Sequence, residues 1–300
     1  MQEEVKWNDR MNIGVESIDK AHKRLFSIMR KLQISMSGDE DGRKRVCIEG
    51  IKYFKSYALK HFAEEEEYMQ SIDYDGYEIH RRLHENLKNT TLPALERDLE
   101  LSDYSVEACR HFQGIMLSWL RGHIMIEDRA IVGKADGKWT HTPDKEEVAE
   151  LEKAIIRVMQ ESFRLAMWIV SDHYAGEEFG PAVCYRMNCR LGEGQKAKIF
   201  LVFEERLALH IVSEALNTRF KKVDKIVNNT IKRLCQHTVK RMEACCGLIK
   251  VESVEKENIL TGDQLSKDFE LGYPQYGLLF DSRQGYFGFC IKKSRAQTKA

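Results

Sequence analysis

Seven side chains in the first half of this chain have the types and spacings of metal ligands. They are His22, His61, Glu65, His80, His84, His123 and Asp128. Imidazole nitrogen together with carboxylate oxygen suits iron, manganese or zinc rather than calcium or an iron–sulfur cluster. Without a metal, burying these polar groups in one small domain would leave many of them unpaired, which costs free energy. The set therefore predicts a buried metal site, and its two carboxylates could bridge two ions.

Helical periodicity places these side chains on inward-facing seams. From Ile51 to Glu65, apolar residues and ligand candidates recur at steps of three or four, which is one face of a helix. The pair His80 and His84 repeats this spacing in the segment HRRLH. Four separate helices thus deliver at least one ligand-type side chain each to a common interior.

The spacing of His123 and Asp128 fits a regular helix badly. Five residues correspond to about 140° around an ideal α-helix, so both side chains cannot lie on one seam. Either the helix is locally irregular there, or Asp128 reaches the site from its flank.

Residues 1–132 are predicted to form an all-α four-helix bundle. Short connections between amphipathic helices favour this architecture. Gly38 is expected to end the first helix, Pro93 to lie near the end of the third, and Ser105 to cap the fourth. The helices are expected at residues 19–36, 41–69, 74–92 and 105–132. Residues 133–143 are polar and rich in glycine, which predicts a linker.

Residues 144–300 are predicted to form a second domain of the α+β class. A long helix over 144–174 is followed by a change from helical to strand-like periodicity after Gly180. The expected strands are 182–191, 196–203, 247–254, 276–280 and 286–291. Two helices are expected between them, at 204–216 and 223–242, and the turn 281–285 joins the last two strands.

Composition limits the functional classes. The chain has 300 residues, 43% of them hydrophobic, which is room for two domains with real cores. Lys plus Arg and Asp plus Glu both number 47, so bulk charge favours neither nucleic-acid nor membrane binding. We find no signal peptide and no apolar run of membrane-spanning length, and the eight cysteines are interpreted as thiols of a cytoplasmic protein.

The segment 1–132 resembles the bacterial hemerythrins. The resemblance is carried by Trp7-Asn8, Ile13-Gly14, Ile18-Asp19, His22, HFAEEEEYM, the pair His80 and His84, and WLRGHIMIED. It implies two non-haem iron ions with an oxo or hydroxo bridge. His80, His84 and His123 would hold one iron and His22 and His61 the other, while Glu65 and Asp128 would bridge both. The open position on the second iron would bind dioxygen reversibly.

The element order of the second half resembles the CheX-type fold of the chemotaxis phosphatases. That family uses an acid and an amide in an E-x2-N motif on a helix. The corresponding stretch reads Thr230-Ile-Lys-Arg233, and His237 stands where a glycine is expected, so no catalytic residues are assigned. Glu214 with Asn217, and Asp224 with Asn228, are the other acid–amide pairs, and both are interpreted as incidental.

Together these features predict an oxygen or redox sensor whose bundle reports to a signalling-type domain. The alternatives are an oxygen carrier or store and a di-iron peroxide or nitric oxide reductase. The resemblances imply dioxygen as ligand, a chemotaxis response regulator or other signalling protein as partner, and a homodimer formed through the second domain. The remaining histidines receive no role; they are His111, His141, His173, His210 and His237.

Overall fold

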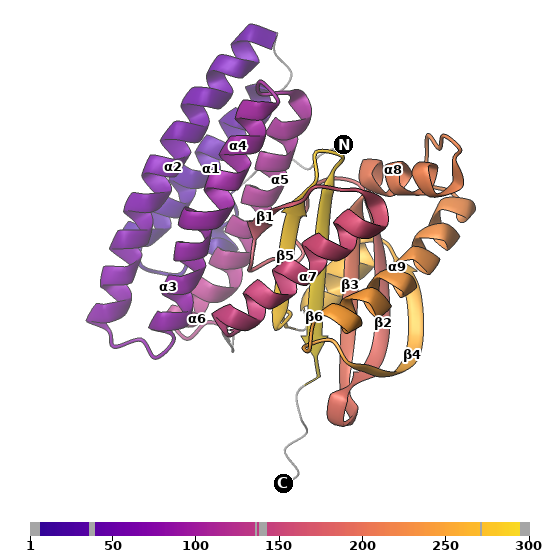
Figure 1. Ribbon diagram of the computed structural model, residues 1–300. Helices are drawn as coiled ribbons and strands as arrows, with labels where there is room; N and C mark the ends of the chain where they lie inside the picture. Colours follow the sequence, from indigo (N-terminus) through magenta and orange to yellow (C-terminus); the bar gives the residue numbers. More distant parts are fainter. Residues whose placement is uncertain (1–6, 36–39, 136, 138–142, 271, 295–300) are drawn as a thin grey trace. The chain divides into compact units, whose positions relative to one another are not determined.

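The computed structural model describes residues 7–35, 40–135, 137, 143–270 and 272–294 (Figure 1). The chain separates into two compact units. The first comprises Met1–Thr140 and Glu177–Phe179, and the second His141–Gly176 and Gly180–Ala300. Each unit is described by itself below.

The first unit is a helical bundle, as predicted. Its long helices contact one another in the cyclic order α1, α2, α3 with α4, and α5. Two of them contain a π-helical turn, so that each continues under more than one label (Figure 1). The elements are η1 (Asp9–Met11), α1 (Glu16–Ser35), α2 (Glu40–Ser71), α3 (Tyr77–Asn86), η2 (Leu87–Thr91), α4 (Leu92–Leu101), α5 (Val106–Gly122), η3 (His123–Asp128) and α6 (Arg129–Ile131).

The third helix extends beyond its predicted end. It was expected to stop near Pro93, but it continues through the π turn η2 into α4 and ends at Leu101. Proline has no N–H to donate to the carbonyl four residues earlier. The chain avoids a break because Leu92 N–H donates five residues back, to the carbonyl of Leu87, and Pro93 occupies the first turn of α4. The wider turn thus accommodates the proline.

Two side chains fix the ends of helices in this bundle. Ser105 caps α5 as predicted, because its hydroxyl accepts from Ala108 N at 3.1 Å. Asp19 in α1 accepts from Ile13 N at 2.7 Å and Gly14 N at 3.0 Å. Gly14 has φ of +96°, a conformation that favours glycine. The Ile13-Gly14 and Asp19 positions of the sequence signature thus shape the turn that leads into α1. The predicted stop at Gly38 lies outside the described residues.

The second unit is an α+β domain, as predicted, built on a six-stranded antiparallel sheet of order β1-β5-β6-β3-β2-β4. Helices α7, α8 and α9 share one hydrophobic core with one face of this sheet. On α10, the ring of Phe269 lies 5.2 Å from that of Phe200 of β3. The elements are α7 (Lys145–Phe163), β1 (Trp168–Ser171), β2 (Ala182–Leu191), η4 (Gly192–Gly194), β3 (Gln195–Glu204), α8 (Glu205–Leu216), α9 (Lys225–Cys245), β4 (Val251–Leu260), α10 (Gly262–Glu270), β5 (Tyr276–Asp281) and β6 (Tyr286–Lys293).

Two sequence predictions for this unit were wrong in extent, and two elements were not predicted. The helix expected over 144–174 ends at Phe163, because Arg164 adopts the left-handed conformation with φ of +56°. The residues after it form β1, which pairs with β5. The strand expected at 247–254 lies at Val251–Leu260, and helix α10 was not predicted. The hairpin of β2 and β3 and the turn before β6 were predicted correctly.

Asp268 joins α10 to three strands of the sheet. Arg186 Nη1 of β2 donates to its carboxylate at 2.6 Å, and Lys198 of β3 donates to the other carboxylate oxygen. Lys292 of β6 donates to its backbone carbonyl. Burial raises the pKa of Asp268, but Lys198 and Arg186 outweigh burial and hold the pKa below its ordinary value.

Replacing Asp268 by asparagine should destabilise the protein by about 1–3 kcal/mol at pH 7, since one of the two cations is partly screened by water. The folded-state pKa is depressed, so the stabilisation is fully present above the unfolded value of about 4 and is lost as pH falls through the folded-state value. Urea unfolding at pH 7 and pH 3 measures this difference. A difference between wild type and Asp268→Asn that stays constant with pH would contradict the assignment.

Candidate metal centre

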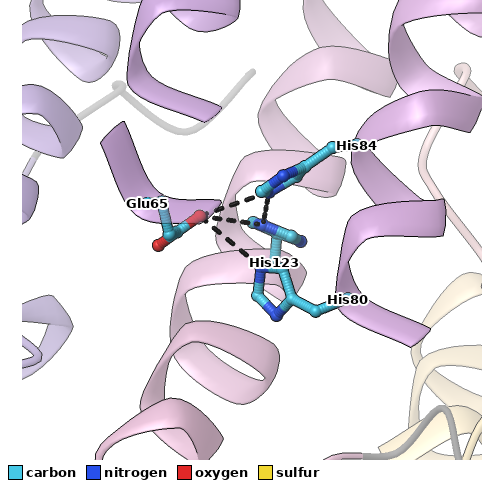
Figure 2. A group of neighbouring side chains, drawn as sticks. All are labelled: Glu65, His80, His84 and His123. Carbon is cyan, nitrogen blue, oxygen red and sulfur yellow. Dashed lines mark hydrogen bonds and ion pairs between the residues drawn. The ribbon is translucent and has the colours of Figure 1, made fainter. Parts of the chain in front are cut away.

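All seven predicted ligand residues come together inside the first unit. His22 comes from α1, His61 and Glu65 from α2, and the other four from α3 and η3. None of them is more than 5% exposed. Figure 2 shows Glu65 pointing toward three imidazole rings from two other helices.

Three histidines and one carboxylate form the first group of donors. His84 Nε2 lies 3.0 Å from His123 Nε2. Glu65 Oε2 lies 3.2 Å from His84 Nε2, and the corresponding distances to His80 and His123 are 3.5 and 3.8 Å (Figure 2). One ligand atom from each of these four residues lies within 4.8 Å of the others, so they could hold one metal ion.

Two histidines form the second group. His22 Nε2 lies 3.0 Å from His61 Nε2, and Glu65 Oε2 lies 3.9 Å from His61 Nε2. These three residues also have ligand atoms within 4.8 Å of one another. Glu65 therefore belongs to both groups, and the second group has one histidine fewer than the first.

Asp128 spans the two groups. Its Oδ2 lies 3.1 Å from His22 Nε2, and its Oδ1 lies 3.0 Å from His123 Nε2 and 3.5 Å from His80 Nε2. One oxygen thus faces each side of the site. The carboxylates of Asp128 and Glu65 both have the placement that a pair of bridging ligands requires.

A π-helical turn resolves the misfit between His123 and Asp128. Residues His123–Asp128 form η3, in which hydrogen bonds join residues five apart rather than four. The fifth residue therefore returns to the face of the first. Glu127, four residues after His123, would share that face in a regular α-helix, yet none of the donor groups above includes it. Of the two alternatives, local irregularity of the helix is correct.

The donor atoms fit a pair of metal ions. Within the described part of the chain, both oxygens of Glu65, both of Asp128 and Nε2 of His80 are buried and have no hydrogen-bond partner of acceptable geometry. Such orphaned groups are costly unless a cation satisfies them. In both groups two Nε2 atoms converge at 3.0 Å. Two ligands at a right angle, each about 2.1 Å from one ion, would be about 3.0 Å apart.

Burial and neighbouring charges shift the pKa values of the donor residues in different directions. Burial raises the pKa of Glu65, but His61 and the other imidazoles outweigh burial and hold the pKa well below its ordinary value. Burial lowers the pKa of His61 and of His123 to about 4. Burial also disfavours the charged form of His84, but the carboxylates of Glu65 and Glu66 outweigh it and raise the pKa to about 9.

Sequence reasoning missed the role of Glu66. No role was predicted for this residue from the sequence. In the structure Glu66 Oε1 lies 2.9 Å from His84 Nδ1. A proton on Nδ1 directs the lone pair of Nε2 toward the donor cluster, and such carboxylate–histidine pairs orient metal ligands. In the sequence, the position of Glu66 next to the ligand Glu65 was the feature that could have indicated this role.

Replacing Glu66 by alanine should lower metal affinity by about 10–100-fold without abolishing binding, because His84 loses its orienting acceptor. Competition with a chelator of known affinity measures this loss. Glu67, which is exposed and in the same acidic run, provides the matched control as Glu67→Ala. Equal affinities of the two variants would contradict an orienting role.

Aromatic rings surround the donor cluster. Phe62 stacks on His84 with ring centroids 4.1 Å apart, and Trp119 stacks on His123 at 4.3 Å. On the side of the two-histidine group, the ring of Trp7 lies 6.4 Å from that of His22. These rings restrict the imidazoles and keep bulk water from the donors.

One member of each acid–amide pair in the second unit has a structural role. Asp224 caps α9, because its carboxylate accepts from Ile226 N at 2.8 Å and Val227 N at 2.9 Å. Asn217 is the left-handed residue that ends α8, with φ of +47°. Capping and chain reversal thus account for these residue types. Among the other histidines, His111 is buried with Nδ1 3.5 Å from Asp98. Among the described residues, no helix combines the length and the apolar character needed to cross a membrane.

Comparisons with known proteins find similarity over the first unit. Residues 13–135 match the family model of the hemerythrin HHE cation binding domain. A bacteriohemerythrin of Pseudomonas aeruginosa is 29% identical over 126 residues, which are 42% of this chain and 78% of that protein. One from Clostridium acetobutylicum is 28% identical over 129 residues, 42% of this chain and 97% of that protein. The myohemerythrin of Theromyzon tessulatum is 25% identical over 136 residues, 44% and 94%.

Solved structures similar to half of the chain are chemotaxis proteins. CheX from Vibrio vulnificus has a TM-score of 0.36 and 12% identity, with 50% of this chain and 99% of that chain covered. A CheX–CheY–BeF3–Mg complex from Borrelia burgdorferi has a TM-score of 0.36 and 10% identity, with 49% and 97% covered.

Proposed function

We propose that the hemerythrin HHE cation binding domain of the first unit, residues 13–135, holds two iron ions and binds dioxygen reversibly. His80, His84 and His123 would hold one ion and His22 and His61 the other. Glu65 and Asp128 would bridge them, together with an oxo or hydroxo group. Bound iron supplies the electrons and the open coordination position that reversible dioxygen binding needs.

The observation that carries this proposal is the unequal division of donors around shared carboxylates. Glu65 Oε2 lies within 3.9 Å of Nε2 of His61, His80, His84 and His123. The oxygens of Asp128 face opposite sides of the site. Because one side has three histidines and the other two, the side of His22 and His61 is the one where a small ligand would find room.

The surrounding residues would keep the site selective. Full burial of Glu65 and Asp128 excludes bulk water, so that the carboxylates stay available to a cation. Trp119 and Phe62 hold two imidazoles in place by stacking. Glu66 keeps the proton of His84 on Nδ1, away from the donor cluster.

Metal analysis and optical spectra of the full chain test the proposal. We expect about two iron ions per chain. Anaerobic reduced protein should be colourless, develop a ligand-to-metal absorption band in air, and lose that band when oxygen is removed. A band that appears irreversibly, with turnover of peroxide or nitric oxide far above that of free iron, would instead favour a reductase.

We propose further that the second unit makes this protein a sensor rather than a store. The supporting observation is a separate folded unit with its own sheet and core, which dioxygen storage would not require. The predicted partner is a chemotaxis response regulator or another signalling protein. For coupling, dioxygen must change the relative free energies of two states of the chain.

A regulator-binding assay distinguishes sensor from store. Affinity of the full chain for an acyl-phosphate response regulator, or the lifetime of that phosphate, should differ between oxygenated and anaerobic protein. The difference should vanish in Glu65→Gln, which retains the second unit. Identical behaviour with and without oxygen, alongside normal reversible oxygenation, would favour the carrier or store.

A further inference from the structure

We propose that Cys47 and Cys109 form a reversible dithiol–disulfide couple inside the helical bundle. Cys47 belongs to α2 and Cys109 to α5, and their sulfur atoms lie 3.3 Å apart. Neither residue is part of a disulfide in the structure. This proposal does not depend on the metal centre, because the pair is defined by its own geometry.

The two side chains already occupy positions from which a bond can form. They are far apart in sequence, yet their sulfur atoms meet in the bundle interior, and each side chain is no more than 2% exposed. For a covalent bond, the sulfur–sulfur distance must fall from 3.3 Å to about 2.05 Å. A buried pair also cannot exchange with partner proteins, which favours an internal bond over a mixed disulfide.

The surroundings of Cys109 favour it as the attacking sulfur. It lies in the first turn of α5, shortly after the capping Ser105. Partial positive charge at a helix N-terminus favours negative charge on a side chain there. Its Sγ lies 3.6 Å from the carbonyl oxygen of Tyr104, to which the reduced thiol can donate a hydrogen bond. Near Cys47, Lys44 of α2 forms an ion pair with Asp103, in the turn between α4 and α5.

Hydrogen peroxide is the oxidant class that the reaction requires. The sulfur of Cys109 attacks one oxygen of peroxide, and the O–O bond breaks. Cys109 becomes a sulfenic acid, and one water molecule is released. Cys47 then attacks that sulfur, the S–S bond forms, and a second water leaves. Two thiols and one peroxide thus give one disulfide and two waters. A small dithiol reductant reverses the step by thiol–disulfide exchange.

The bond would join the two helices that carry or precede most of the carboxylate and imidazole donors. His61 lies further along α2 than Cys47, and His123 directly follows α5, the helix that contains Cys109. The crosslink would therefore lie about four helical turns from the donor cluster on both helices. Closing a loop of this length constrains the unfolded chain, so the oxidised bundle should resist unfolding more than the reduced one.

Thiol counting and peptide mapping of the full chain test the proposal. After limited hydrogen peroxide, free thiols under denaturing conditions should fall from eight to six, the intact mass should fall by about 2 Da, and a peptide containing Cys47 should be linked to one containing Cys109. The melting temperature of the first unit should rise by at least about 4 °C and return after dithiothreitol. Cys47→Ser and Cys109→Ser should each lose the crosslink and the rise.

A control variant and a second substitution keep the test decisive. Cys245→Ser, in the second unit, should behave like wild type in the crosslinking assay. The double variant Cys47→Ala with Cys109→Ala shows whether the loss reflects missing sulfur rather than a misfolded bundle, because its helical circular dichroism should be unchanged. Eight free thiols after peroxide, oxidation ending at sulfinic acid, or a crosslink between other cysteines would each overturn the proposal.

Discussion

Replacing Glu65 by glutamine is expected to abolish binding of the metal pair. The substitution keeps the size of the side chain but removes the charge of a carboxylate that lies near four imidazole nitrogens. Changes to residues that only support metal ligands already cost about 10–100-fold in affinity, so loss of a shared ligand should cost at least about 100-fold. Metal content per purified chain measures the effect directly.

The neighbouring acidic residues provide a matched control for this substitution. Glu64 is exposed, one residue before Glu65, and its nearest charged partner is Lys60 at 3.6 Å. Glu64→Gln should therefore retain metal and colour. If Glu65→Gln kept about two ions per chain with native helical content, the assignment of Glu65 as a shared ligand would be wrong.

Asparagine at position 128 is expected to have a comparably large effect. Asp128 is completely buried, and its two oxygens contact imidazoles on opposite sides of the site. Its carboxylate also raises the pKa of His22 against the opposing effect of burial, so Asp128→Asn removes both a ligand and a charge. We expect at least about a 100-fold loss of metal affinity and no oxygen-dependent absorption band.

The adjacent Glu127 tests whether the π turn selects the ligand. Glu127 is also buried, and it occupies the position that a regular helix would place beside His123. Because η3 directs Asp128 there instead, Glu127→Gln should keep both the metal ions and the band. Loss of metal in Glu127→Gln together with retention in Asp128→Asn would show that this segment is an ordinary α-helix in solution.

Many features of the first unit followed from sequence because they depend on local periodicity. Steps of three and four residues put His61 with Glu65, and His80 with His84, on inward faces whatever the bundle looks like. The cap at Ser105 is likewise set by its own hydroxyl and the backbone next to it. Helix ends were less predictable. The third helix continues past Pro93 because the π turn η2 connects it to α4, and this turn depends on packing in the bundle. In the second unit, Arg164 gave no signal that its helix would end there.

The sequence by itself determined which side chains could bind metal, because ligand chemistry and helical spacing are local properties of the chain. Tertiary structure alone decided how those donors divide into groups of three and two histidines, since that division depends on distances between four helices. It also decided that Asp128 rather than Glu127 faces the donor cluster, and it placed Glu66 within hydrogen-bond distance of His84. The hydrogen-bonding pattern of a helical turn and the approach of a second helix are fixed by packing over the whole bundle, which the residues of a single segment do not encode.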